Sequence, residues 1–490
     1  MEKPFDISAW RPTKPPDPPD SPQEQEQKLE NTQYLIAQLV MRTRAILDKP
    51  YDADNWLRRA DTLARLQYPE LAVGDAHKAE LLCRKALADL DRRPDHRLGY
   101  RMGFWLLDEA HGACWDDEEN EALQIHLTKL QSQARQIQTE NMYFWPEHDE
   151  VRIVPQQYPW LQAKHQTRSD KLMAKLNQEF TENPIKTHSS KPFCELRGDA
   201  FDAGKASSDV LGVFATCDIT DDTLILTDIS RTFGCIGTGR DGRLCGVNGS
   251  NGCQVWTHPN LESDPVEFDL RWIRDRVGKN APNSILQCRL LLCCIEDGVS
   301  HPLEHSLVAR LTPVYHRQKP RVFSLEADYA VINEALQQFG IDIYANRNFD
   351  TWVLFTLQAR IENNSWSSPT ATCLNPLFSL FNHSCEPNVK WNTQSDHRTI
   401  KMKASRYIKK GEQLFVEYDG FVSLQPLEDR RKRLRRWIDG PCQCTRCVRE
   451  EKDQLEQAES GGSVSSSDSS NWDTGDKPVF PEDKLRRKLH

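Results

Sequence analysis

The chain has 490 residues, a net charge of -9 and 38% hydrophobic residues. This length and composition predict a globular protein of two to four domains. The acidic balance disfavours a nucleic-acid binder, and the lack of a long apolar run argues against a signal peptide or a membrane span. We therefore expect an intracellular protein, in the nucleus or the cytoplasm, whose cysteines are reduced thiols or metal ligands.

The N-terminal third is predicted to be helical after a short leader. Residues 1–28 are rich in proline and poor in large apolar residues, which predicts a disordered leader. From 29 to 138 apolar residues recur at helical spacing. Trp56, Ala60 and Ala72 resemble the positions at which a tetratricopeptide-type hairpin packs its two helices. A plain helical bundle without a peptide-binding groove explains the same pattern equally well.

The middle of the chain mixes short elements. Residues 139–190 read as a connector with a helix around 169–180. Residues 207–229 alternate in polarity, which predicts two short strands joined by a turn at Asp221-Asp222. A further helix is expected from Phe349 to Trp366. The apolar run 285–295 predicts buried core thiols, namely Cys288, Cys293 and Cys294.

The C-terminal end is polar. Residues 426–437 form a basic helix, which we interpret as a solvated helix packed by Leu434 and Trp437 in preference to a nucleic-acid patch. Residues 450–490 are rich in Ser, Gly, Asp and Glu, which predicts a disordered tail. The basic residues 484–488 are either a nuclear address or simply a charged end.

Three stretches could carry chemistry. They are Phe381–Asn388 (FNHSCEPN), Gly411–Tyr418 (GEQLFVEY) and Cys442–Cys447 (CQCTRC). The last stretch holds three thiols within six residues. A structural zinc takes four soft ligands in a tetrahedron, so this triplet leaves one vertex for a distant residue.

Together the three stretches resemble the signature of SET-domain protein lysine methyltransferases. Their order and spacing look most like the branch in which an insert splits the domain, as in the SET-and-MYND proteins. The resemblance implies an α+β multidomain fold: a tetratricopeptide-like helical segment, then a mostly-β SET domain of the β-clip type, closed by a zinc-bound post-SET segment. We place the SET domain at 191–420, its insert at about 230–325, and the post-SET helix and cysteines at 421–449.

The insert occupies the place of the two-zinc MYND module. Four of its residues could be imagined as ligands, but none of them forms the paired CxxC motifs that would make a zinc site specific: Cys235, Cys245, Cys253 and His258. We therefore interpret the insert as an eroded remnant without metal.

The resemblance also implies the ligand-binding residues. The fourth ligand of a structural zinc would be Cys385, joining Cys442, Cys444 and Cys447. S-adenosyl-L-methionine would be the methyl donor, contacted by three polar residues and faced at its methionine end by a glycine: Asn364, Asn382, His383 and Gly212. The chain departs from the family at two points. Val210 replaces the first glycine of the turn, and no aromatic residue directly precedes Cys442, where Trp437 is the nearest replacement.

Tyr418 matches the catalytic tyrosine of the family. A lysine must lose its proton before it can accept a methyl group, although its free pKa is about 10.4. An apolar channel beside a cationic sulfonium would lower that pKa, and the tyrosine hydroxyl would orient the amine. Phe381 and Phe415 are candidate walls of this channel.

The sequence thus favours a protein-lysine N-methyltransferase that acts on a histone or a non-histone protein. Its expected partner is a protein or peptide presenting lysine, with no nucleic acid and no membrane, and the oligomeric state is not predicted. One alternative is a non-catalytic SET-derived interaction scaffold, which Val210, the missing aromatic and the eroded insert favour. A second alternative, a zinc-dependent nucleic-acid binder, is disfavoured by the acidic balance.

Overall fold

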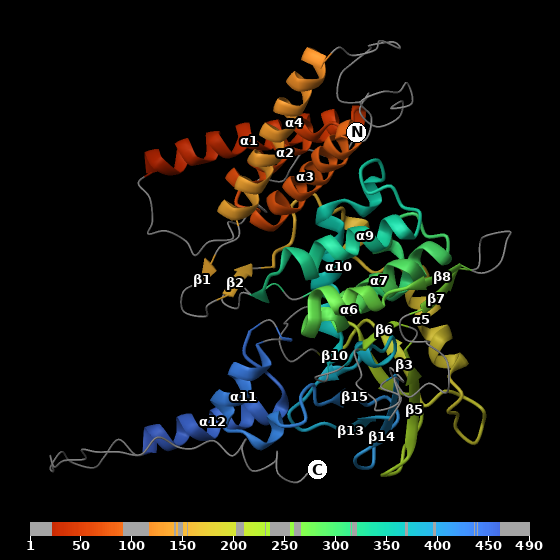
Figure 1. The fold of residues 1–490 in the computed structure, drawn as a ribbon. Coiled ribbons are helices and arrows are strands. Elements are labelled where there is room, and N and C mark those ends of the chain that lie inside the picture. Colours follow the sequence, from red (N-terminus) through yellow and green to blue (C-terminus); the bar gives the residue numbers. More distant parts are fainter. Residues whose placement is uncertain are drawn as a thin grey trace, which may run out of the picture.

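The computed structural model describes residues 22–91, 117–141, 144–145, 150–153, 155–201, 210–230, 232–235, 255–258, 266–313, 315, 321–367, 371–394, 398–435, 437–438 and 440–460. Figure 1 shows three tiers, with the N-terminal helices at the top, a second group of helices in the middle and the β-sheets below. Most of the expected leader and most of the expected tail lie outside the described residues. Among the residues that are described, no helix combines the length and apolarity needed to cross a membrane.

The top tier consists of four helices: α1 (Pro22–Asp48), α2 (Ala53–Arg65), α3 (Pro69–Asp91) and α4 (Asp117–Asn141). The Asp52 side chain caps α2 by accepting the backbone N–H of Asp54 at 2.9 Å. Trp56 and Leu127 are buried in the core that these helices share. Whether the α2–α3 hairpin is of the tetratricopeptide kind stays a prediction.

Helix α1 corrects the expected boundary of the leader, because it begins at Pro22 instead of near residue 29. Proline is favourable at the first helical position, and the Gln/Glu-rich residues that follow it have high helix propensity. The proline content that indicates disorder is therefore concentrated before this point.

A buried ionic clamp fastens the top tier to the middle tier. The clamp consists of Arg59 on α2, Asp75 on α3 and Asp350. The Arg59 guanidinium contacts the Asp75 carboxylate at 2.6 and 2.9 Å and the Asp350 carboxylate at 2.8 and 3.0 Å. Beside it, the Lys78 ammonium donates to the carbonyl of Ile343 at 2.8 Å. The helical segment is thus packed rigidly against the rest of the chain.

A connector follows. It contains β1 (Phe144–Trp145), β2 (Glu150–Ile153), a 3-10 turn (Ala163–His165) and α5 (Asp170–Glu182). Strand β2 pairs with β1 and with β9 (Arg321–Val322). The helix expected around 169–180 is confirmed, and the Ser169 hydroxyl caps it by accepting the N–H of Leu172.

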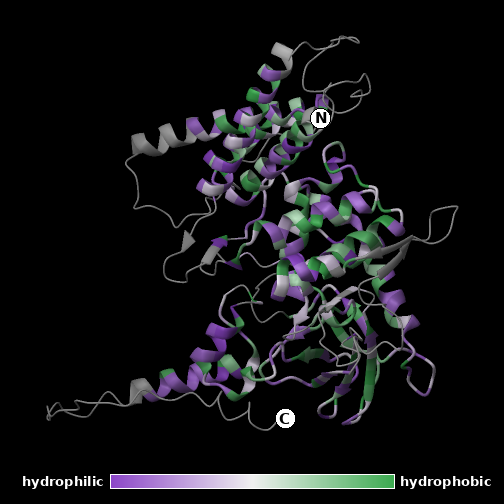
Figure 2. Cartoon of the chain, viewed as in Figure 1, coloured by the Kyte–Doolittle hydropathy of each residue, from purple (hydrophilic) through white to green (hydrophobic). Residues whose placement is uncertain are grey.

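The middle tier is helical. It contains β7 (Val255–His258), β8 (Val266–Asp269), α6 (Arg271–Val277), α7 (Ala281–Glu296), α8 (Ser306–Ala309), α9 (Val331–Gln338) and α10 (Thr351–Asn364), with short 3-10 or π-helical turns at Gly278–Asn280, Pro302–Glu304, Glu326–Ala330 and Arg347–Phe349. Helix α7 is buried over most of its length and is largely coloured as hydrophobic in Figure 2. Cys288, Cys293 and Cys294 are fully buried there, which confirms the prediction of core thiols. Cys245 and Cys253 lie outside the described residues.

The lower tier contains small sheets. One has the order β12 (Asn382–His383), β15 (Gln413–Val416), β4 (Gly212–Ala215) and β3 (Cys194–Arg197). A second has the order β13 (Val389–Thr393), β14 (Thr399–Ala404) and β5 (Leu224–Ile229). A third has the order β10 (Trp366–Ser367), β11 (Ala371–Leu374) and β6 (Thr232–Cys235). The turn Phe378–Leu380 is a 3-10 helix that leads into β12.

Two sequence predictions change here. Strands β4 and β5 exist as expected, with Asp222 in a left-handed turn between them at φ 58°. However, they hydrogen-bond to different sheets, because β15 and β14 from the C-terminal part are their partners. Strand β6 pairs with β11, so the sheet part of the domain extends to 235, beyond the expected start of the insert at 230.

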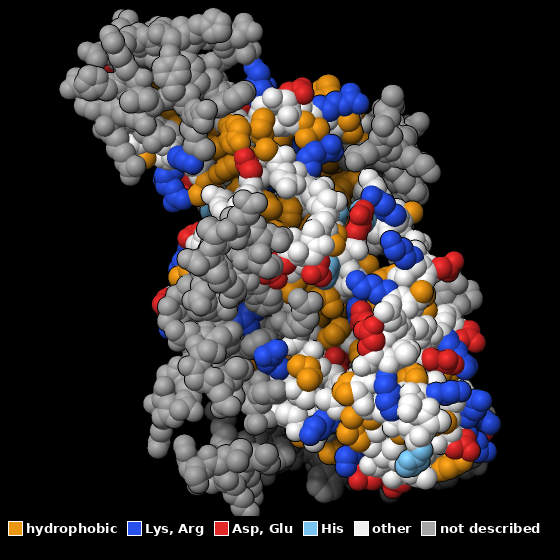
Figure 3. Space-filling view, turned by 90° about the vertical axis from the view of Figure 1, so that its right-hand side faces the viewer, with side chains coloured by type: hydrophobic (Ala, Val, Ile, Leu, Met, Phe, Trp, Pro, Cys, Tyr) orange, Lys and Arg blue, Asp and Glu red, His pale blue; other side chains and the backbone are white. Residues whose placement is uncertain are grey.

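The C-terminal part contains a 3-10 turn (Val422–Leu424), α11 (Leu427–Leu434) and α12 (Thr445–Ser460). Helix α12 corrects the expected tail, since the chain stays helical ten residues past 450. Ion pairs from Arg430 and Arg446 to Glu450 and from Arg431 to Glu451 hold the helix. These pairs also use up much of the charge of the basic helix, as expected for a packed helix. On the face drawn in Figure 3, Lys and Arg are interspersed with Asp and Glu.

Candidate functional site

The Asn-His-Ser-Cys segment is held in place by strand pairing. Strand β12 runs parallel to β15, with Asn382 opposite Phe415 and His383 opposite Val416. The Asn388 side chain extends this pairing, because its Nδ2 donates to Gln413 O at 2.8 Å and its Oδ1 accepts Phe415 N–H at 2.7 Å. The two stretches that lie 30 residues apart in sequence thus form one rigid unit.

Tyr418 follows this strand and turns back over the segment. Its backbone N–H donates to His383 Nδ1 at 3.2 Å, and its hydroxyl donates to Phe381 O at 3.0 Å. The Tyr418 and His383 rings lie 5.2 Å apart. The tyrosine therefore faces the residues expected to accompany it.

His383 connects the tyrosine to the cysteine cluster. Burial lowers the pKa of His383 to about 4, so the ring is neutral at pH 7. Because Nδ1 accepts the Tyr418 N–H, the ring proton is on Nε2, which lies 3.3 Å from Cys385 Sγ. The histidine thus donates to the sulfur and supports the backbone of the tyrosine at the same time.

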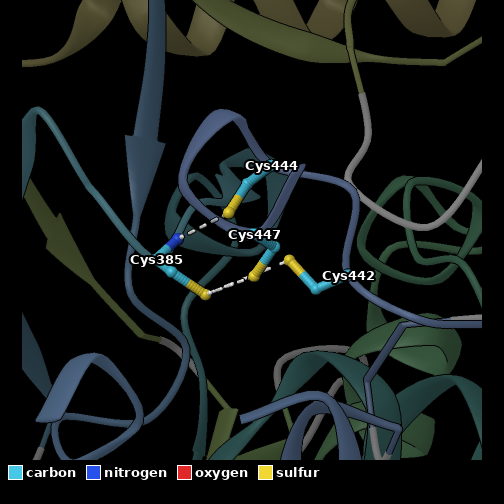
Figure 4. Close-up of side chains that lie close together, drawn as sticks. All are labelled: Cys385, Cys442, Cys444 and Cys447. Carbon is cyan, nitrogen blue, oxygen red and sulfur yellow. Dashed lines mark hydrogen bonds between the residues drawn. The ribbon is translucent and has the colours of Figure 1, made fainter. Parts of the chain in front are cut away.

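Four cysteines converge at the end of this unit (Figure 4). The sulfur of Cys385 lies 3.6 Å from that of Cys447 and 4.0 Å from that of Cys442, and its backbone N–H donates to Cys444 Sγ at 3.4 Å. All four sulfurs lie within 4.8 Å of one another and are buried. Sulfurs bound to a tetrahedral zinc at ~2.3 Å are ~3.8 Å apart. The cluster therefore has the dimensions and the donor set of a structural zinc site.

The surroundings of the cluster suit thiolates. Arg430 is almost fully buried, and it donates to Cys447 Sγ at 3.6 Å and to the Glu450 carboxylate. Hydrogen bonds from Cys385 and Cys442, helped by Arg430, lower the pKa of Cys447 to about 7. A thiolate is the form in which cysteine binds metal.

A cavity of about 490 Å³ opens beside Tyr418. Its wall combines aromatic rings with polar and basic side chains from the connector, the middle tier and the lower tier: Arg168, Arg310, Thr312, Asn363, Asn364, Trp366, Phe378, Phe381, Asn382, Trp391, Tyr418, Arg433 and Trp437, together with Val210, Leu211, Ser365, Ser367, Ser379, Leu380, Asp419, Gly420, Phe421 and Ile438. Such a mixture of apolar walls and few polar groups is typical of a small-molecule site.

The predicted cofactor residues divide into two groups. Asn364 and Asn382 line the cavity, whereas His383 and Gly212 lie behind its wall. The Asn382 Nδ2 donates to Leu211 O at 2.9 Å, and a Cβ on Gly212 would stand 2.5 Å from Ala200 Cβ. Gly212 is therefore needed because two strands approach closely, while its neighbours Val210 and Leu211 face the cavity.

The aromatic residues also divide. Trp437 lines the cavity with its ring 6.4 Å from that of Tyr418, in the place where the sequence lacks the usual aromatic. Phe381 lines the cavity as expected. Phe415 instead lies in a separate open groove beside Phe201, because alternate residues of a strand point to opposite faces.

Several cavity residues were missed in the sequence. Arg168 belongs to the connector, and Arg310 and Thr312 belong to the middle tier. None of them lies in a recognisable motif, and only the tertiary structure brings them beside Tyr418. A buried basic residue just before a helix cap is the one local signal that singles out Arg168.

Comparisons with known proteins agree with this geometry. Residues 210–419 match the SET domain family. The histone-lysine N-methyltransferase SET5 of Yarrowia lipolytica is 44% identical over 78 residues, which is 16% of this chain and 17% of the relative. The histone-lysine N-methyltransferase SMYD3 of Mus musculus is 39% identical over 80 residues, which is 16% of this chain and 18% of the relative. A SET and MYND domain-containing protein of Dictyostelium discoideum is 30% identical over 103 residues, 21% of this chain and 19% of the relative. The matches thus span about a fifth or less of these curated relatives.

Proposed function

Because the chain is a SET-domain protein similar to the SET-and-MYND methyltransferases, we propose that it transfers a methyl group from S-adenosyl-L-methionine to a lysine of a protein substrate. The observation that carries this proposal is the position of Tyr418. Its hydroxyl is bonded to the backbone of Phe381, directly before Asn382 and His383, and it borders a cavity. Two relatives are named as histone-lysine methyltransferases, which favours a nuclear or cytoplasmic protein with a histone or another protein as substrate.

The donor fits the residues that line the cavity. S-adenosyl-L-methionine supplies an electrophilic methyl group on a sulfonium, and it carries an adenine and an amino acid. Trp437 offers an aromatic face, and Asn364 and Asn382 offer amides in the same cavity. In this proposal Asn382, His383 and Gly212 keep the wall in shape, while Asn364 and Trp437 contact the ligand.

The chain's own residues would prepare the lysine. Phe378, Phe381 and Trp391 present apolar surface near Tyr418, which disfavours an ammonium and lowers the pKa of an entering amine. The Tyr418 hydroxyl would orient the neutral amine for in-line attack, because its position is fixed at both the ring and the backbone.

We also propose that Cys385, Cys442, Cys444 and Cys447 hold one structural zinc. All four positions are thiols, so no vertex is left for water, and the metal would have no part in the chemistry. Its effect would be to fasten α12 and the Trp437 segment over the cavity. Metal analysis of the folded protein should give one zinc per chain at this site, and serine at Cys385 should abolish it.

The test of the enzyme is transfer of labelled methyl groups into peptide and protein arrays, followed by mass-spectrometric mapping of modified lysines. Tyr418→Phe should lower transfer about 100-fold or more, because loss of orientation is costly. Tyr407→Phe, an exposed tyrosine 11 residues away, is the matched control and should keep full activity. Full activity of Tyr418→Phe would remove that residue from the mechanism.

A non-catalytic scaffold is the second candidate. Val210 lines the cavity where the family has glycine, so the space for a donor is reduced there. Calorimetry with S-adenosylhomocysteine separates the two functions, because a scaffold requires no affinity for it. Binding without transfer to any substrate would favour a regulatory pocket, and absence of binding would favour the scaffold.

A further inference from the structure

Arg168 is a cation in the wall of the cavity without an acidic partner. It directly precedes the cap of α5, and its guanidinium donates to Arg310 O at 3.0 Å and to the Thr312 hydroxyl. Its Nε is buried and finds no hydrogen-bond partner among the described residues. Two contacts on one side thus orient the guanidinium, while part of its donor capacity remains unused.

The other arginines of the cavity differ in this respect. Arg310 is neutralised by the Glu179 carboxylate through two contacts of 2.6 Å, and Arg433 is paired with Asp419. Within the part of the chain that the structure describes, no carboxylate lies within 4.0 Å of the Arg168 guanidinium. Burial and the neighbouring charge of Arg360 lower the pKa of Arg168 to about 10, which still leaves it charged at pH 7. This part of the wall is therefore electropositive.

Asn363 supplies the complementary group. Its Nδ2 donates to Thr312 O at 2.8 Å, but its Oδ1 is buried and has no hydrogen-bond donor among the described residues. Arg168 and Asn363 thus both bind Thr312, one at its hydroxyl and the other at its carbonyl, and both line the cavity. One wall therefore presents an unneutralised cation and an unused acceptor around a shared residue.

We propose that Arg168 and Asn363 form the subsite for the amino-acid end of the donor, with Arg168 binding the α-carboxylate and Asn363 Oδ1 accepting from the α-ammonium. This inference rests on the proposed function. Guanidinium and carboxylate match in charge and planar geometry, and an ammonium supplies the donor that Oδ1 lacks. A zwitterion satisfies both groups at once, which a phosphate or a neutral ligand does not. Asn364, in contrast, spends its Nδ2 on Thr312 O and Arg360 O and is left to shape the wall.

The test compares two ligands that differ in the amino-acid end. Calorimetry of the full-length protein measures affinity for S-adenosylhomocysteine, which carries the zwitterion, and for 5'-methylthioadenosine, which lacks it. Arg168→Gln should weaken S-adenosylhomocysteine binding about 10- to 100-fold, because charge-assisted hydrogen bonds are lost. Binding of 5'-methylthioadenosine should stay unchanged, and this also shows that the variant is folded. Arg168→Lys should restore part of the loss.

The matched control is Lys164→Gln, which removes a cation four residues earlier that is exposed and paired with Glu304. It should bind both ligands like the wild type. Equal loss for both ligands in Arg168→Gln, or no loss for S-adenosylhomocysteine, would overturn the subsite while leaving the proposed methyl transfer intact. If the wild type binds neither ligand, both the subsite and the proposed donor are wrong.

Discussion

Arg430 offers a direct test of the proposed zinc site. Only 1% of this side chain is exposed, and its guanidinium joins Cys447 Sγ, Glu450 and the carbonyl of Gln425. Four thiolates around a divalent zinc carry a net charge of -2 in a buried place. A buried cation that donates to one of the sulfurs offsets part of that charge. Replacing it by methionine keeps much of the packing volume and removes the charge.

The expected effect follows from the role of residues behind the ligands. Loss of such a contact typically lowers metal affinity 10- to 100-fold, which corresponds to about 1.4 to 2.8 kcal/mol. Arg430→Met should therefore release zinc to a chelating dye at a correspondingly lower chelator concentration. The far-UV circular dichroism before release should match the wild type, since the helices keep their apolar contacts.

Arg431→Met is the matched control. Arg431 is the next residue and is also largely buried, but its guanidinium pairs with Glu451 at 2.8 Å and donates to no sulfur. It should retain zinc within about threefold of the wild type, because the median worth of such a half-exposed pair is below 1 kcal/mol. If Arg430→Met and Arg431→Met hold zinc equally well, Arg430 does not support a metal site.

The remaining predictions concern stability. Arg59→Met should destabilise the protein by about 3 to 5 kcal/mol in urea unfolding, because it leaves the two buried carboxylates of the ionic clamp unpaired, whereas the exposed Arg58→Met should cost less than 1 kcal/mol; similar values for the two variants would argue against the clamp. Burial raises the pKa of Asp228 from 3.8 to about 6, so the stability that its protonated form contributes is present at low pH and is lost as the pH rises through 6. Asp228→Asn should therefore be more stable than the wild type at pH 7.5, by on the order of 3 kcal/mol, and equal to it near pH 4; lower stability at pH 7.5 would contradict the assignment. Gly212→Ala should cost about 1 to 3 kcal/mol, since its new methyl group would lie 2.5 Å from a neighbouring alanine, and an unchanged unfolding midpoint would refute this close approach.

The sequence by itself determined the parts of the protein whose chemistry is local. The stretch from Asn382 to Cys385, the strand ending at Tyr418 and the triplet Cys442–Cys447 each have a recognisable order of residue types. Helical periodicity and cap residues such as Ser169 also depend on neighbours a few positions away, which is why α5 was predicted closely. Compositional disorder was less reliable at its edges, because helix propensity and long-range ion pairs extend α1 and α12.

Only the tertiary structure decided which distant groups meet. Strands β4 and β5 follow each other in sequence, yet each pairs with a strand nearly 200 residues away. Arg168 contacts Thr312 across 144 positions, and Arg59 contacts Asp350 across 291. No local pattern records such contacts, because they depend on how the helices and sheets pack over the whole chain. For this reason the motifs indicate the reaction, while the residues that would hold the amino-acid end of its donor emerge only from the folded chain.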